Sequence, residues 1–107
     1  MSVHGLARLQ PIRRFIVRER SMVPFLQPGQ GVIAIRWPHR RAGQVRVVRH
    51  PADHTMWIVK RLDRAVDAER WHVLADNRTE GIDSEQFGPV DLSDSWLVVV
   101  AIPLRLM

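Results

Sequence analysis

Hydrophobic residues in this chain occur in short runs, which are separated by segments rich in glycine, proline and charged residues. The runs are rich in β-branched and aromatic residues and show little helical periodicity, as is typical of β-strands. We expect strands in six runs: 15–17, 31–36, 45–49, 56–62, 71–74 and 96–102. The pattern predicts an all-β fold, a small single-domain β-barrel or sandwich of about six strands.

The segments between these runs differ in character. The strongest helical signal is a short segment after Ser21, through residues 24–26. Residues 63–70 are polar and are expected to link the fourth and fifth strands as a hairpin. Residues 76–90 form a long irregular stretch, and loops of that length in a compact domain are often functional.

The chain of 107 residues has the length of one domain, with residues 1–14 expected to form an N-terminal arm and residues 15–107 the folded domain. The role of the arm stays open. Cysteine is absent, which excludes a disulfide framework and a cysteine-based zinc site. No run reaches the roughly 18 apolar residues that span a membrane, and the N-terminus lacks a secretory signal. We therefore expect a cytoplasmic protein with no membrane anchor.

The net charge of +5 and the sequence pI of about 11.4 make nucleic acid a partner to consider. The basic residues are scattered, however, and acidic residues are interleaved with them from Asp53 onwards. A solvated surface explains most of them, with an acidic substrate as the sharper alternative. His50 and His54 are four residues apart, but Pro51 argues against a helix that presents both to one metal. We expect no metal site and no cofactor.

Lysine occurs once in the chain, at Lys60, whereas the other 15 of the 16 basic residues are arginines. An arginine keeps its proton in proteins, whereas a lysine in apolar surroundings can lose it and act as a base. Lys60 follows the apolar residues 56–59, where a charge would be costly. This position favours a functional amine, although a lysine that points into water would need no function.

Three short segments give Lys60 a context. They are Ser21-Met22-Val23-Pro24, Val59-Lys60-Arg61, and Asp76-Asn77 followed by Asp83-Ser84. In this order, within a β protein, they resemble the signal peptidase I family of serine–lysine peptidases. The 39-residue spacing between Ser21 and Lys60 fits the compact members of that family. Residues 28–30 and 42–44 match its Gly-Asp boxes, with glutamine in place of aspartate. The resemblance covers about residues 17–100, nearly the whole chain.

Within this family, a short chain without an anchor looks most like the nickel-type superoxide dismutase maturation proteases. Those enzymes remove an N-terminal propeptide so that the new N-terminus can bind nickel. The resemblance implies a fold like that of signal peptidases and self-cleaving repressors. It also implies a soluble endopeptidase without a cofactor, whose partner is a precursor protein, with nickel superoxide dismutase as the expected substrate.

The resemblance also implies residue roles. Ser21 would be the nucleophile, with its backbone N–H in the oxyanion hole, and Lys60 the general base. A lysine is a base near neutral pH only if its pKa falls from about 10.4 to roughly 7–8, which burial can cause. Residues 56–59, Met22 and Phe25 are expected to build that apolar pocket. The implied substrate-binding residues are Met22, Pro24, Asp76 and Asn77. The implied structural supports are Arg61, which pairs with Asp83 in the family pattern, and Ser84.

One departure from the family pattern concerns the oxyanion hole. Glu19 lies two residues before the serine, where the family often has a residue that donates a hydrogen bond, so the second donor is unassigned. Two other functions stay open. A self-cleaving repressor-type protease would use the same dyad, but its typical Ala-Gly cleavage site occurs only at Ala42-Gly43, after Ser21. A non-enzymatic basic β-barrel would bind nucleic acid with a steep dependence on salt.

Overall fold

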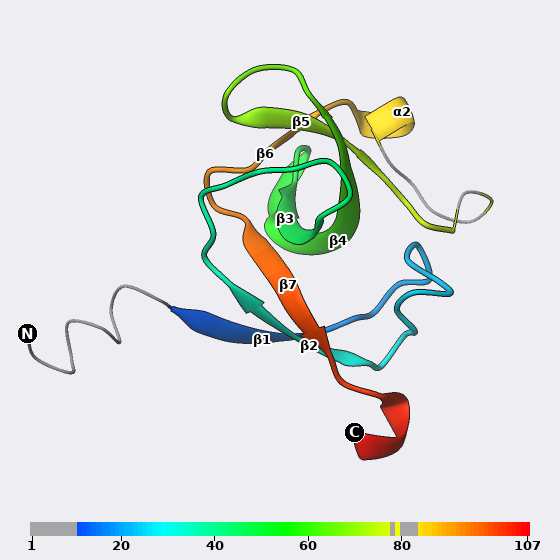
Figure 1. Cartoon of the computed structure of the whole chain (residues 1–107). Coiled ribbons are helices and arrows are strands. Elements are labelled where there is room, and N and C mark those ends of the chain that lie inside the picture. The colour runs from blue at the N-terminus through cyan, green and yellow to red at the C-terminus, as the bar shows by residue number, and fades with distance from the viewer. Residues whose placement is uncertain (1–10, 78, 80–83) are drawn as a thin grey trace, which may run out of the picture.

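The computed structural model describes residues 11–77, 79 and 84–107, without the side chains of Ser84 and Glu85. As expected, the fold is all-β, with seven strands in one antiparallel sheet (Figure 1). The strands are β1 (Ile12–Ile16), β2 (Gly31–Ile35), β3 (Val45–His50), β4 (Asp53–Ala65), β5 (Arg70–Leu74), β6 (Val90–Asp91) and β7 (Trp96–Ala101). The described helices are α2 (Ser84–Phe87) and the 3-10 helix η1 (Leu104–Leu106).

Each of the six predicted runs overlaps a strand, but the extents differ. Strand β1 begins at Ile12, so residues 12–14, which the sequence analysis assigned to the arm, pair with β2 in the sheet. The segment after Ser21 forms turns rather than a helix. The additional strand, β6, has only two residues, too few for a period-two pattern to be recognised.

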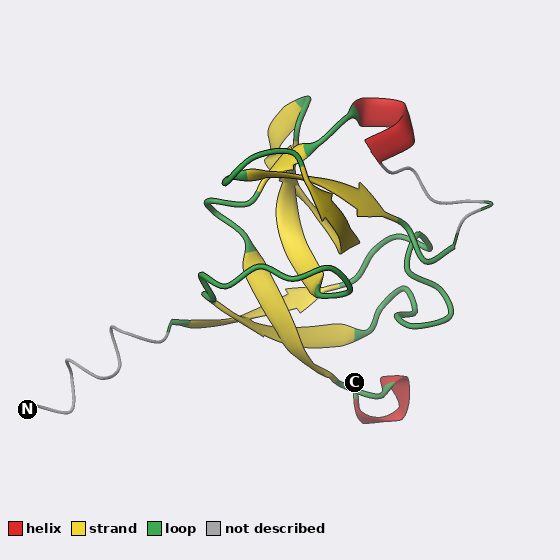
Figure 2. Cartoon of the chain, turned by 45° about the horizontal axis from the view of Figure 1, so that its top comes forward, coloured by secondary structure: helices red, strands yellow, loops and turns green. Residues whose placement is uncertain are grey.

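The sheet curls along β4, a long strand that pairs with β3 along one part of its length and with β5 along another. The order across the sheet is β1-β2-β7-β3-β4-β5-β6, and β4 has 13 residues. Strand β6 closes back against β3, and Figures 1 and 2 show β3 and β4 wound within the upper part of the molecule. Strands β1 and β6 are the two hydrogen-bonding edges.

The burial of β4 alternates along the strand, which determines where Lys60 points. Ile58, Lys60 and Leu62 are buried, whereas the residues between them are only partly buried. Since successive side chains of a strand point to opposite faces, Lys60 shares a face with Ile58 and Leu62. Those two residues belong to the apolar cluster inside the curl, which consists of Val48, Ile58, Leu62, Val73, Val90 and Leu92. The lone lysine is thus directed towards the interior.

A second cation, Arg46 of β3, is also buried, with 1% of the residue exposed. Its guanidinium donates four hydrogen bonds of 2.9–3.0 Å to neutral acceptors. These acceptors are Gln44 Oε1, the carbonyl oxygens of Trp37 and His39, and Ser95 Oγ. Burial and the nearby Arg40 lower the pKa of Arg46 to about 10. Arg46 therefore stays charged at neutral pH and joins β3 to two loops.

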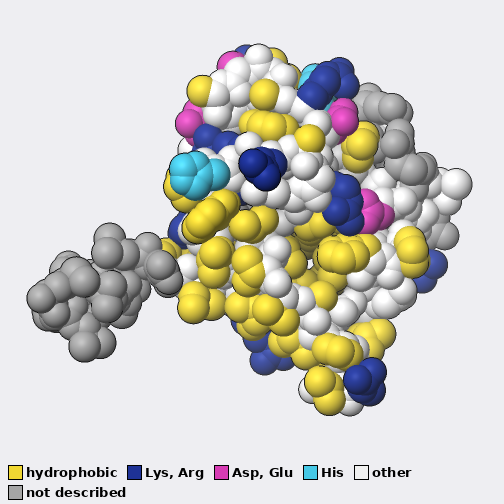
Figure 3. Space-filling model, in the orientation of Figure 1, with side chains coloured by type: hydrophobic (Ala, Val, Ile, Leu, Met, Phe, Trp, Pro, Cys, Tyr) yellow, Lys and Arg dark blue, Asp and Glu magenta, His cyan; other side chains and the backbone are white. Residues whose placement is uncertain are grey.

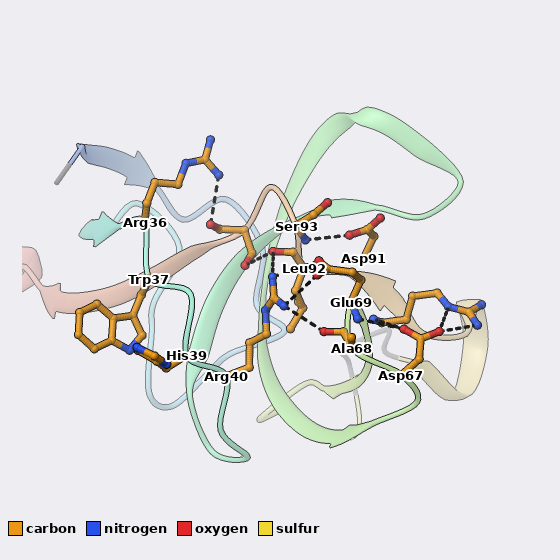
Figure 4. Close-up of polar contacts among 12 residues, drawn as sticks. Arg36, Trp37, His39, Arg40, Asp67, Ala68, Glu69, Asp91, Leu92 and Ser93 are labelled. Atoms are coloured by element: carbon orange, nitrogen blue, oxygen red, sulfur yellow. Dashed lines mark hydrogen bonds and ion pairs between the residues drawn. The ribbon is translucent and has the colours of Figure 1, made fainter. Parts of the chain in front are cut away.

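Arg40, which lies in the loop before β3, extends this network at the surface. It donates to the carbonyl oxygens of Ala68 and Leu92 and to the carboxylate of Glu69 (Figure 4). The loop before β3 is thereby tied to the turn between β4 and β5 and to the segment before β7. Together, Arg40 and Arg46 fix a region that contains little regular structure.

The two Gly-Gln turns are held by their glutamine side chains. Gly29 and Gly43 have φ values of 88° and 92°, which glycine adopts without strain. Gln30 Oε1 accepts a hydrogen bond from the backbone N–H of Gln27, and Gln44 links Arg46 to the His39 carbonyl. Gln30 and Gln44 therefore have a structural role here.

Apolar side chains cover much of one surface (Figure 3), over the part of the molecule where β7, β2 and η1 lie in Figure 1. The exposed residues of β7 and the C-terminal segment are Val99, Val100, Leu104, Leu106 and Met107. Within the described residues, no helix is long and apolar enough to cross a membrane. The same residues contain no group of three or more histidine or acidic side chains placed to hold a metal ion.

The Arg46 network gives a first prediction. Arg46→Ala removes a fully buried side chain and the donor of four hydrogen bonds, so it should lower the free energy of unfolding by about 3 kcal/mol. Arg41→Ala, at an exposed position, is the matched control and should change it by less than about 0.5 kcal/mol. Urea unfolding measures both, and equal effects would contradict the structural role of Arg46.

Candidate active site

Ser21 lies in an anchored turn that follows β1. Before it, the backbone of Val17 pairs with Gln30 and Gly29, with N–O distances of 2.8 and 2.7 Å. After it, the backbone N–H of Leu26 donates to the Met22 carbonyl at 2.8 Å, and both side chains are buried in an apolar cluster. Ser21 is itself 94% buried, with 6% exposed. The turn therefore holds the serine firmly at the edge of the core.

Asn77 brings the third predicted segment to the serine. Its backbone N–H donates to the Ser21 carbonyl at 2.7 Å, and its side-chain Nδ2 donates to the Arg20 carbonyl at 3.0 Å. The loop after β5 thus holds the chain on both sides of the bond between Arg20 and Ser21. The sequence analysis expected Asn77 to bind substrate, and the contacts seen here are ones that position the backbone at Ser21.

Arg61 fixes the same loop to β4. Its guanidinium makes two hydrogen bonds to the Asp76 carboxylate, at 2.8 and 2.7 Å, and a third to the Gly43 carbonyl at 2.8 Å. The bond to Asp76 raises the pKa of Arg61. The guanidinium also lies 5.0 Å from the ring centroid of Phe25, in the serine turn. Arg61 therefore joins β4, the Asp76-Asn77 loop and the serine turn.

The described partner of Arg61 is the Asp76 carboxylate. The resemblance implied a pair between Arg61 and Asp83, and that pair stays a prediction. Asp83 and the side chain of Ser84 lie outside the described residues. Asp76 was expected to bind substrate, and its carboxylate is instead occupied by Arg61.

Lys60 is among the most deeply buried residues of the candidate site, with 1% of the residue exposed. It lines a pocket together with Glu19, His50, Met56, Ile58 and Phe87. The walls are mostly apolar, and the rim carries one acidic and one imidazole side chain. Ser21 lines a second pocket, of which Met22, Trp57 and Val59 are also part. Glu19 and Ile58 belong to both pockets, so the two adjoin.

The expected pocket residues divide between these two sites. Met56 and Ile58 line the lysine pocket, while Trp57, Val59 and Met22 line the serine pocket. Phe25 lines neither of them, which corrects the expectation, because its ring is turned outwards against Arg61 and is 48% exposed. Pro24 is exposed in the turn after the serine. A hydrogen bond between Ser21 Oγ and Lys60 Nζ stays a prediction.

The sequence analysis missed Arg46, which is the direct cross-strand partner of Lys60 in the register of β3 and β4. A signal was present, since Arg46 interrupts the apolar run 45–48 much as Lys60 ends the run 56–60. A solvated surface was expected for most of the basic residues, and Arg46 is an exception, with 1% of the residue exposed. The structure places the buried residues Arg46 and Lys60 directly opposite each other.

Comparison with known proteins adds no relative: no family model matches this chain, and no curated protein matches it. The resemblance to serine–lysine peptidases therefore rests on the short sequence motifs and their spacing alone. The geometry is independent of that resemblance. It brings Ser21 and Asn77 into contact and buries Ser21 and Lys60 in adjoining pockets.

The ion pair between Arg61 and Asp76 can be tested with a double-mutant cycle of Arg61→Ala and Asp76→Ala. The pair is bidentate and partly buried, so we expect a coupling energy of about 1.5 kcal/mol in urea unfolding. Arg70 and Asp67, at the turn between β4 and β5, form a more exposed pair with the same residue types. Their cycle should give a clearly smaller coupling. Equal couplings would show that burial adds nothing to the Arg61–Asp76 pair.

Proposed function

We propose that this protein is a serine endopeptidase with a Ser21–Lys60 dyad, which removes an N-terminal propeptide from a precursor protein. The precursor of nickel superoxide dismutase is the candidate substrate, on the basis of the sequence resemblance. The observation that carries the proposal is the burial of Lys60 in a pocket that adjoins the pocket of Ser21. A nucleophile and its general base must lie close together, and a lysine on the surface would not lie next to Ser21.

Two features of the surroundings of Lys60 disfavour its charged form. Burial disfavours the charged form of a lysine. Arg46 lies directly opposite on β3, and side chains at directly opposed positions project from the same face of a sheet, where like charges repel. Arg46 keeps its proton at neutral pH, since its pKa is about 10. Loss of the proton from Lys60 relieves this repulsion and leaves an amine that can accept the serine proton.

The proposed reaction has two steps. Ser21 Oγ attacks the scissile carbonyl carbon while its proton passes to Lys60 Nζ, and Lys60 then gives that proton to the leaving amine as the peptide bond breaks. Lys60 next takes a proton from water, which attacks the acyl-enzyme, and passes that proton to Ser21 Oγ as the bond from Oγ to the acyl carbon breaks. The backbone N–H of Ser21 would stabilise the oxyanion. Asn77 Nδ2 donates to the Arg20 carbonyl, which belongs to the same peptide unit as the Ser21 N–H, and so helps to fix the orientation of this donor.

The position of Ala42-Gly43 favours cleavage of another protein over self-cleavage. The backbone N–H of Gly43 donates to the Leu62 carbonyl at 2.8 Å, and the Gly43 carbonyl accepts from Arg61 at 2.8 Å. Both polar groups of Gly43 are thus bound to residues of β4. To reach Ser21, this turn would have to break contacts that also hold the Asp76-Asn77 loop.

The dyad is tested by incubating the protein with the nickel superoxide dismutase precursor and, separately, with a proteome-derived peptide library. New N-termini are then measured by mass spectrometry. Ser21→Ala and Lys60→Arg should lower cleavage by at least about a hundredfold, because one lacks the nucleophile and the other keeps the charge but cannot act as a base.

Two further variants complete the test. Lys60→Met keeps the long apolar stem in the pocket and covers the case in which the larger arginine impairs folding. Ser93→Ala, at an exposed loop position, is the matched serine control and should cleave normally. Undiminished cleavage by folded Lys60→Met would overturn the dyad.

The rate of cleavage should fall as the pH is lowered, because protonated Lys60 cannot accept the proton of Ser21. A profile of kcat/KM against pH for the best peptide measures this acid limb. Glu19 and His50 line the same pocket, so His50→Gln and Glu19→Gln are the controls. A loss of the acid limb in His50→Gln would assign it to the imidazole instead of to Lys60.

A further inference from the structure

Three arginines lie on aromatic rings on the face of the sheet opposite to Lys60. Arg13 of β1 lies 4.8, 5.6 and 5.9 Å from the ring centroids of Phe15, Trp57 and Trp96. Arg36 lies 3.9 Å from the ring of Trp96, and Arg49 lies 4.1 Å from that of Trp57. Phe15 packs edge-on against both tryptophans. We call these six residues the arginine–aromatic surface.

This surface already binds one carboxylate, that of Asp94. Arg36 and Arg49 contact its two oxygens at 2.9 and 2.6 Å. These hydrogen bonds, with the one from Arg49 the stronger, lower the pKa of Asp94, so the carboxylate is charged at neutral pH. Two guanidinium groups on tryptophan rings thus suit a carboxylate held between them. Aspartate carboxylates are an appropriate partner for such planar donors.

Arg13 is the third cation and has no such partner. It is exposed, and within the described part of the chain no carboxylate contacts it. The three guanidinium groups and the single carboxylate of Asp94 leave a net positive charge. An incoming anion would meet Arg13 at the outer side of the ring cluster.

The surface is continuous with the candidate active site. Phe15 and Trp57, on which Arg13 lies, also line the pocket of Ser21. An extended polypeptide that occupies this pocket can therefore pass directly over the two rings to Arg13.

We propose that the arginine–aromatic surface binds an acidic segment of the polypeptide substrate, close to the bond that is cleaved. This inference rests on the proposed function. Arg13 supplies the charge that selects aspartate or glutamate side chains, and the rings beneath it supply the apolar floor. The ion pairs of Arg36 and Arg49 with Asp94 favour a carboxylate as the ligand. The continuity of this surface with the Ser21 pocket favours a polypeptide over a nucleic acid.

The test measures binding without cleavage, in the full chain carrying Ser21→Ala. Two fluorescein-labelled synthetic peptides of equal length are the probes, one rich in aspartate and one with asparagine at the same positions. We expect the aspartate peptide to bind more tightly in fluorescence anisotropy. Adding Arg13→Gln should weaken its binding about threefold, as for an exposed ion pair, and leave the asparagine peptide unchanged.

The matched control is Arg14→Gln, which removes the same charge from the next position of β1, on the opposite face. It should leave both peptides unaffected. If both variants weakened binding of the aspartate peptide equally, the effect would come from net charge alone, and the proposal would be overturned. Stronger dependence on Arg13 for a thymidine oligonucleotide than for the aspartate peptide would also overturn it, in favour of nucleic acid.

The outcome is separable from that of the proposed function, because binding to the Ser21→Ala variant needs no dyad. Loss of the Arg13 effect with intact cleavage would refute the acidic-segment proposal alone. A selective Arg13 effect without cleavage by the Ser21-containing protein would refute the peptidase alone.

Discussion

The buried guanidinium of Arg46 is the constraint around which the centre of this protein is organised. A charge with 1% of its residue exposed must have its hydrogen-bond donors satisfied, and Arg46 achieves this with four neutral acceptors. Those acceptors come from the segments that precede β3 and β7. The loops around β3 therefore cannot move independently, although they contain almost no regular secondary structure.

The same charge gives a physical reason for the single lysine. Position 60 is opposite Arg46 in the register, on a face that is otherwise apolar. An arginine there would place two permanent charges next to each other in the interior. Their repulsion could not be relieved, because an arginine does not lose its proton. A lysine can lose its proton and become a neutral amine at this position. The composition of the chain and the register of β3 and β4 thus lead to the same interpretation of Lys60.

The sequence revealed what depends on local pattern and missed what depends on tertiary contacts. Alternation and turn residues located the main strands, and the burial of Lys60 followed from its apolar run. The sequence could not show that Asp76 would pair with Arg61, because several carboxylates in the loop could reach that guanidinium. Arg46 was missed because an arginine in a β-run is usually exposed, and only the loops that supply its acceptors make burial possible.

The site is held from two directions that have different physical origins. On one side, Arg61, Asp76 and Asn77 fix the backbone at Ser21 through charged and neutral hydrogen bonds. On the other side, Lys60 is directed into its pocket by the alternation of β4 and by apolar packing. Arg61 directly follows Lys60 in β4, so one strand carries both the proposed base and the arginine that holds the Asp76-Asn77 loop. A shift of one residue in the register of β4 would exchange their faces, and neither side chain could then make its contacts.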